Sequence, residues 1–338
     1  MTTQGSRVAA TLGFLIVAVA TPSMAAGMTE AELCDLYLGV VEDAVSVFEP
    51  LWTDVSASVP NAGYFDFIKY DTWLPEWYGS EITVCGNGQI VFCYALLLNH
   101  TDKATFTDRH VPRAVLRDHA IQAIRWCCLT SGYVENPYPF PTEGMYPRRI
   151  KDGKYWIRPH GHRTDVLGWL TTGIAMLWDE LDEETRGLVE DVMIGMAPKE
   201  RIVRQWTFVQ GGNHDVVKQD MSSTVGAAFL FPGRDDHDLY LDIVRGNGID
   251  LVSTMHDRAC AAVAAGKPIR EWSKGWNLYP DYSSDHHGWC QIWYGCDLIF
   301  EGRYYIEFLS RLMNIPVLET FTYPGNGFDG VLEWIKST

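Results

Sequence analysis

Two short segments in the C-terminal half combine residue types that can donate and accept protons. The first runs from Trp206 to Asp215 and contains Gly211-Gly212-Asn213-His214. Two glycines allow the backbone to approach a ligand closely. Asn213 lies at a predicted loop-to-helix junction, where asparagine is also a favoured N-cap residue, so a purely structural role stays open. His214 could be a buried core histidine, a charge-neutralising donor or a base.

The second segment runs from Tyr279 to Tyr294 and places two adjacent histidines just before a predicted helix over residues 288–300. Positions i and i+7 share one helical face, so His287 and Tyr294 are expected to point into the same cleft. The positive end of the helix dipole disfavours protonated His287, which keeps the ring available as a base. His286 and His287 could instead ligate a metal. No third ligand follows at helical spacing, so we expect no metal.

These segments resemble a known family. Asp281-Tyr282-Ser283 followed by His287-Gly288 resembles the Asp-Tyr-Ser…His-Gly stretch of the chondroitin and hyaluronan lyases of polysaccharide lyase family 8. Gly211–Asn213, followed by Asp215, is similar to that family's Gly-x-Asn motif. Tyr155-Trp156-Ile157 and the helix ending in Asp179-Glu180-Leu181 resemble its Trp-rich segment and the following helix. The resemblance covers about residues 155–300, and Asn213-His214 also resembles the Asn-His pair of the toroid-only alginate lyases.

The resemblance implies an (α/α) toroid that cleaves a uronate-containing glycan by β-elimination. Carried over to this chain, Asn213 meets the uronate carboxyl group, His287 is the catalytic histidine and Tyr294 the catalytic tyrosine. Arg303 is a candidate for the active-site arginine. The gap from His287 to Tyr294 is shorter than in the family by about two residues, so Tyr282 is a rival for the tyrosine role.

The chemistry of elimination explains why these residue types are needed. Removing the C5 proton of a uronate puts a second negative charge beside the carboxylate, and Asn213 can stabilise that charge by donating hydrogen bonds. Tyr294 could act as base and acid if a cation such as Arg303 or a protonated histidine lowers its pKa below about 10. His287 could instead be the base and Tyr294 the acid. No cofactor is required.

Charge and aromatic content suggest how a glycan would be held. The net charge of −16 argues against nucleic acid and anionic membranes as partners. Between residues 148 and 163, however, six Arg or Lys residues are opposed only by Asp152, which predicts a local basic patch for an acidic polysaccharide or a solvated loop. The chain has 13 Trp and 16 Tyr residues, whose rings could line a sugar cleft or fill the core. The candidate substrate-binding residues are Trp156, Arg158, His160, Arg163, Trp206, His286, Trp289 and Trp293.

The N-terminus is typical of a secretory signal peptide over residues 1–25. Arg7 supplies the positive charge, an apolar run follows from Val8 to Ala20, and Ser23-Met24-Ala25 is a small-x-small cleavage site. The run is too short for a membrane span of about 20 residues. We therefore expect a secreted or periplasmic protein, a compartment in which the eight cysteines could form disulfides.

Helical periodicity dominates the rest of the chain, which predicts an all-α fold, a single (α/α) toroid or barrel over residues 26–338. Thr29 and Glu32 form a capping box that opens the first amphipathic run. Longer irregular stretches, at Ser56–Val84, Tyr133–His162, Val203–Asn213 and Lys267–His286, are expected to gather at one end and build the site. The predicted helices are 29–48, 111–129, 165–179, 183–196, 216–231, 236–245, 249–265, 288–300 and 304–313.

The sequence is also compatible with three other functions. A glycoside hydrolase on a similar barrel needs two carboxylates flanking the bond, and Asp215, Asp220, Asp281 and Asp285 could supply them. A uronate C5-epimerase would share the proton abstraction but leave the chain intact. A non-catalytic glycan-binding protein would hold sugar through Trp206, Trp289 and Trp293.

Overall fold

The computed structural model describes residues 28–66, 78–100, 111–135, 137–138, 165–201, 215–283, 285–286, 289–290, 306–315, 323 and 330. For 78–85, 165–166, 215–220, 285–286 and 289–290 it describes the backbone alone. The fold is mostly helical with a few short strands, which is compatible with the predicted all-α class. None of the helices in the described ranges has the length and apolar character to cross a membrane.

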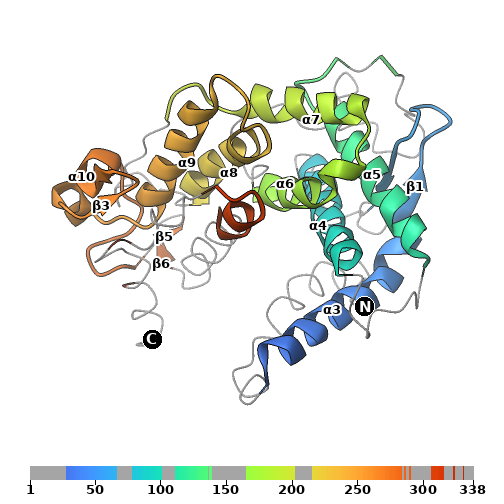
Figure 1. The fold of residues 1–338 in the computed structure, drawn as a ribbon, viewed down its shortest axis with the longest axis horizontal. Coiled ribbons are helices and arrows are strands. Elements are labelled where there is room, and N and C mark those ends of the chain that lie inside the picture. Colours follow the sequence, from blue (N-terminus) through green and yellow to red (C-terminus); the bar gives the residue numbers. More distant parts are fainter. Residues whose placement is uncertain are drawn as a thin grey trace. The chain divides into compact units, whose positions relative to one another are not determined.

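The chain divides into two compact units. Unit 1 comprises Met1–Ile157 and Met176–Val189, and unit 2 comprises Arg158–Ala175 and Glu190–Thr338. The boundary therefore passes through two helices, α6 (Asp165–Leu177) and α7 (Glu183–Met196). Figure 1 shows the elements of both units along the chain.

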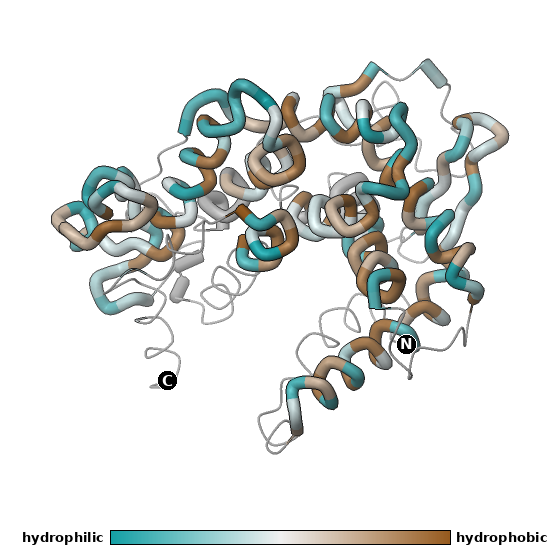
Figure 2. The backbone as a smooth tube through the Cα atoms, in the orientation of Figure 1, coloured by the Kyte–Doolittle hydropathy of each residue, from teal (hydrophilic) through white to brown (hydrophobic). Residues whose placement is uncertain are grey.

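The first helix in the described part of unit 1 is α3 (Glu30–Phe48), whose start is set by local chemistry. The Thr29 hydroxyl accepts from the Glu32 backbone N–H, while the Glu32 carboxylate accepts from the Thr29 backbone N–H at 2.7 Å. This is the predicted capping box, which satisfies two backbone donors at the helix start. Figure 2 shows hydrophobic and hydrophilic residues recurring in turn along α3, as expected of a helix with one buried face.

The rest of unit 1 packs two helices around a short hairpin. Strand β1 pairs antiparallel with β2, with Trp52 opposite Phe65, and α4 packs against α5. The amide of Asn87 on α4 donates to the Phe65 carbonyl at 3.0 Å and accepts from its N–H at 2.8 Å, which ties the hairpin to the helix. The elements described here are η1 (Glu49–Leu51), β1 (Trp52–Asp54), β2 (Gly63–Phe65), α4 (Tyr78–Asn99), α5 (Arg113–Leu129) and η3 (Trp178–Glu180).

Unit 2 is built on the packed pair of helices α8 (Asp215–Leu230) and α9 (His237–Leu251), which lie side by side (Figure 1). Its core joins apolar residues of α8 and α9 to Ile269 and Trp272 of α10 and to Ile306 and Leu309 of the helical stretch 306–312. The other named elements in the described part of unit 2 are η5 (Met255–Ala259), β3 (Val263–Ala264), β4 (Lys267–Pro268), α10 (Ile269–Trp272), β5 (Asp285–His286) and β6 (Trp289–Cys290).

Most helices predicted from periodicity are confirmed. The helix predicted over 183–196 is observed as α7, and the one predicted over 216–231 is α8, one residue earlier at each end. The predicted irregular stretch 56–84, in contrast, contains strand β2 and the first turns of α4. Three glycines within α4, a residue type with poor helix propensity, mask its helical pattern.

The helix predicted over 249–265 is wrong, because α9 ends at Leu251. The Ser253 hydroxyl donates to the Ile249 carbonyl at 2.6 Å, a local bond that competes with the helical ladder. Thr254 then caps the separate 3-10 helix η5. Beyond it, Ala265 and Gly266 both have positive φ, +47° and +75°, which is the geometry of a two-residue hairpin turn between β3 and β4.

The helix predicted over 288–300 does not begin where expected. Trp289–Cys290 is the strand β6, paired antiparallel with Asp285–His286 in β5. Its backbone hydrogen bonds therefore run between strands rather than along a helix. The argument that His287 and Tyr294 share a helical face is accordingly lost, because it required helical spacing from residue 288 onward.

Candidate functional site

Most of the predicted site residues lie outside the described part of the chain. For His286 and Trp289 the structure describes the backbone only. Tyr282 is the one predicted site residue whose side chain is described. The residues outside the described ranges are Asn213, His214, His287, Tyr294, Arg303, Trp156, Arg158, His160, Arg163, Trp206 and Trp293.

Tyr282 occupies a tight turn in an unusual backbone conformation. Its φ is +65°, in the left-handed region that a bulky residue rarely adopts. The Tyr282 N–H donates to the Tyr279 carbonyl at 2.8 Å, and the Tyr279 N–H donates to the Ser283 carbonyl at 2.9 Å. The half-buried Tyr282 ring rests on Gly330, where it leaves no room for a β-carbon. Two backbone bonds and one ring contact thus hold the strained conformation.

The neighbouring carboxylate stabilises the same turn. Asp281 accepts from the Ser283 hydroxyl at 2.7 Å and from the Ser283 backbone N–H at 3.1 Å. The Ser283 hydrogen bonds lower the pKa of Asp281, because they stabilise its charged form. Strands β5 and β6 follow directly, and His287 and Gly288 are the two residues between them in the sequence. The Asp281–Gly288 motif therefore begins at the Tyr282 turn, and strands β5 and β6 pair antiparallel with His287 and Gly288 between them in the sequence.

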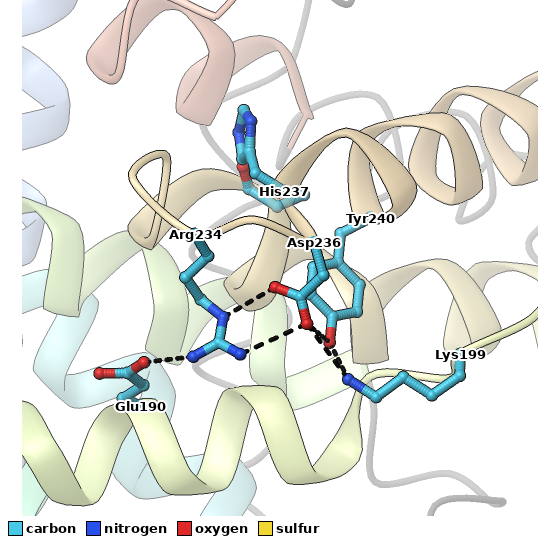
Figure 3. Close-up of polar contacts among 7 residues, drawn as sticks. Glu190, Lys199, Arg234, Asp236, His237 and Tyr240 are labelled. Carbon is cyan, nitrogen blue, oxygen red and sulfur yellow. Dashed lines mark hydrogen bonds and ion pairs between the residues drawn. The ribbon is translucent and has the colours of Figure 1, made fainter.

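A second group of polar side chains, in unit 2, surrounds Asp236 at the start of α9 (Figure 3). Arg234 donates from Nε to Asp236 at 2.8 Å and from a terminal nitrogen to Glu190 at 2.6 Å. The buried Tyr240 hydroxyl donates to Asp236 at 3.1 Å, and Lys199 contacts both Tyr240 and Asp236. The network joins α7 and Lys199 to the start of α9.

We expect the network around Asp236 to make the free energy of unfolding fall at low pH. Hydrogen bonds from Arg234 hold the pKa of Asp236 well below its usual value. A carboxyl group with a lower pKa in the folded state stabilises the fold above its unfolded pKa of about 3.9 and loses that contribution as the pH falls toward the folded pKa. Asp236→Asn should therefore flatten the decline of the free energy of unfolding between about pH 5 and pH 2, measured by urea denaturation. Parallel curves for the two proteins would contradict this role.

A third polar group, in unit 1, was missed by sequence reasoning. Glu49 accepts from the Tyr94 hydroxyl at 2.6 Å, and its other carboxylate oxygen lies 3.1 Å from Nδ1 of His119. Trp52 stacks on the His119 ring, with centroids 3.8 Å apart. Burial raises the pKa of Tyr94, which keeps its hydroxyl protonated as a donor. Glu49 and His119 are 70 residues apart, so no local pattern couples them.

The arrangement around His119 fixes how its ring can act. With Glu49 ionised, Nδ1 carries the proton that is donated to the carboxylate, and Nε2 of the neutral ring is left as the acceptor. A carboxylate that orients a histidine in this way is a common part of acid–base sites. Within the described ranges, no three His, Cys, Asp or Glu side chains lie close enough together to hold a metal ion.

Comparison of the chain with protein-family models, with curated proteins and with solved structures yields no match.

Proposed function

We propose that this protein is a secreted polysaccharide lyase that cleaves a uronic-acid-containing glycan by β-elimination. The proposal is supported by the Asp281–Gly288 segment and the Gly211–Asn213 motif, which resemble those of the chondroitin and hyaluronan lyases. The mostly helical fold is compatible with an (α/α) toroid, which we propose as the finer architecture. The packed helix pairs α4–α5 and α8–α9 are the kind of unit from which such a toroid is built.

The observation that carries the proposal is the backbone of Tyr282. A φ of +65° on a bulky residue is costly, of order 1–3 kcal/mol, and such strain is concentrated at functional sites. Tyr282 lies inside the segment that the resemblance identifies as catalytic, five residues before His287. Glycine would adopt this φ without strain, whereas tyrosine brings a phenol side chain to the turn at an energetic cost.

The loss of helical spacing after Gly288 also changes the choice between tyrosines. Both the family resemblance and the expected helical alignment with His287 favour Tyr294, and strand β6 removes the second of these reasons. We therefore propose Tyr282 as the tyrosine that donates a proton to the leaving oxygen. His287 then removes the C5 proton, and Asn213 donates hydrogen bonds to the uronate carboxyl group. The C4–O bond breaks as the C4–C5 double bond forms.

The test is ultraviolet absorbance over time with the purified protein and separate uronate polymers: hyaluronan, chondroitin, alginate, glucuronan and pectate. We expect one polymer to give a rise from the new C4–C5 double bond, and His287→Ala to lower the rate by about 10² to 10⁴. Reducing ends without a rise in absorbance would show hydrolysis and overturn the lyase proposal. Binding without either signal would identify a glycan-binding protein instead.

A further inference from the structure

Arg201 is bound at the point where the chain enters the 202–214 segment, which carries Asn213. Its guanidinium donates to the Gly246 carbonyl on α9 at 2.5 Å and to the Trp272 carbonyl at the end of α10. It also forms an ion pair with Asp250, also on α9. The side chains of Arg201 and Asp250 are 12% and 3% exposed, so water screens their attraction only weakly. One cation therefore connects three parts of unit 2.

Asp250 also binds the backbone of the segment that leads to His287. Its Oδ1 accepts from the Lys274 backbone N–H at 3.1 Å, just after α10. The Asn277 and Leu278 N–H groups then donate to the Ser253 carbonyl, at 3.1 and 3.0 Å, immediately after α9. Burial raises the pKa of Asp250, and the attraction of Arg201 offsets part of that rise. Residues 274–278 lead directly into the Tyr282 turn and the β5–β6 hairpin.

Gly246 on α9 leaves the space that the Arg201 guanidinium occupies. A β-carbon there would lie 2.5 to 2.7 Å from three atoms of the Arg201 guanidinium, closer than real contacts allow. Glycine in the interior of a helix costs about 1 kcal/mol relative to alanine. At this position the absent side chain is what lets the guanidinium reach the Gly246 carbonyl.

From these contacts we infer that the Arg201–Asp250 ion pair is the common anchor of residue 201 and residues 274–278, from which the chain runs on to Asn213 and to His287, and that this anchor positions both catalytic groups for the elimination reaction. The inference rests on the proposed function for its catalytic part, but the anchoring is a property of the fold. A misplacement of about 1 Å at a catalytic group can cost about 10² in rate, so a positioning pair can matter without touching substrate.

The test uses Arg201→Lys, which keeps the charge but loses the planar fork that reaches Gly246, Trp272 and Asp250 together. We expect hydrogen exchange of the amides in 202–214 and 274–290 to become at least about 10-fold faster, since local opening sets this rate. We expect kcat to fall by about 10- to 100-fold, with a smaller change in KM. Gly246→Ala, which displaces the guanidinium, should reproduce both effects.

Arg125→Lys is the matched control. Arg125 is also a buried arginine, bound to the Pro60 carbonyl at 2.9 Å and to Glu184 at 2.6 Å, but it belongs to unit 1. It should lower the stability of the protein without changing kcat or exchange in the two segments. Unchanged exchange in either segment of Arg201→Lys would overturn the anchoring, whether or not the wild type shows lyase activity. Faster exchange with unchanged kcat would overturn the positioning role.

Discussion

Tyr282→Phe is expected to lower kcat for uronate elimination by about 10² to 10⁴, because it removes the proton donor for the leaving oxygen and keeps the ring. The ring contact with Gly330, the bond from the Tyr282 N–H to the Tyr279 carbonyl and the bond from the Tyr279 N–H to the Ser283 carbonyl do not involve the phenol oxygen. The variant should therefore fold normally, with a KM close to that of the wild type. The ultraviolet assay with the active polymer measures both constants.

Tyr294→Phe is the matched comparison for this result. It removes a phenol from the tyrosine that the resemblance first suggested, and we expect a change in kcat of less than about 10-fold. The reverse outcome, with activity lost in Tyr294→Phe and kept in Tyr282→Phe, would return the catalytic role to Tyr294. If both variants keep the kcat of the wild type, neither tyrosine is the proton donor and the proposed mechanism is contradicted.

Trp126→Ala should lower the free energy of unfolding by about 3 to 5 kcal/mol, more than the other substitutions discussed here. Trp126 on α5 has no solvent exposure, and its ring stacks on Tyr64 with centroids 4.7 Å apart. Alanine would remove buried apolar area and leave a cavity between α5 and strand β2. Urea denaturation followed by circular dichroism measures the change.

Two variants control for this prediction. Trp126→Phe keeps an aromatic ring beside Tyr64 and should lose clearly less stability than Trp126→Ala. Val47→Ala removes an apolar side chain from unit 1 that is 38% exposed, and should change the free energy of unfolding by no more than about 0.5 kcal/mol. A loss below about 1 kcal/mol in Trp126→Ala would show that Trp126 is not part of a tightly packed core.

Features that depend on local interactions could be predicted from the amino-acid sequence. The capping box at Thr29 and Glu32 predicted the start of α3, because its hydrogen bonds join residues three positions apart. The apolar spacing of residues 183–196 predicted α7, because one face of an amphipathic helix must be buried. The resemblance of the Asp281–Ser283 motif depends on residue order alone, whereas the positive φ of Tyr282 within it is seen only in the structure.

Contacts between residues that are distant in the sequence could not be predicted and depend on the fold. Periodicity extended a helix through 249–265, but the Ser253 and Thr254 side chains end it and the Ala265–Gly266 turn reverses the chain. Strand β6 replaced the predicted helix start because its backbone pairs with β5. The Glu49–His119 pair and the Arg201–Asp250 anchor join residues far apart in sequence. Such contacts form because buried polar groups are stable only when they are hydrogen-bonded or paired. The spacing of residues along the chain does not indicate which distant residue will be the partner.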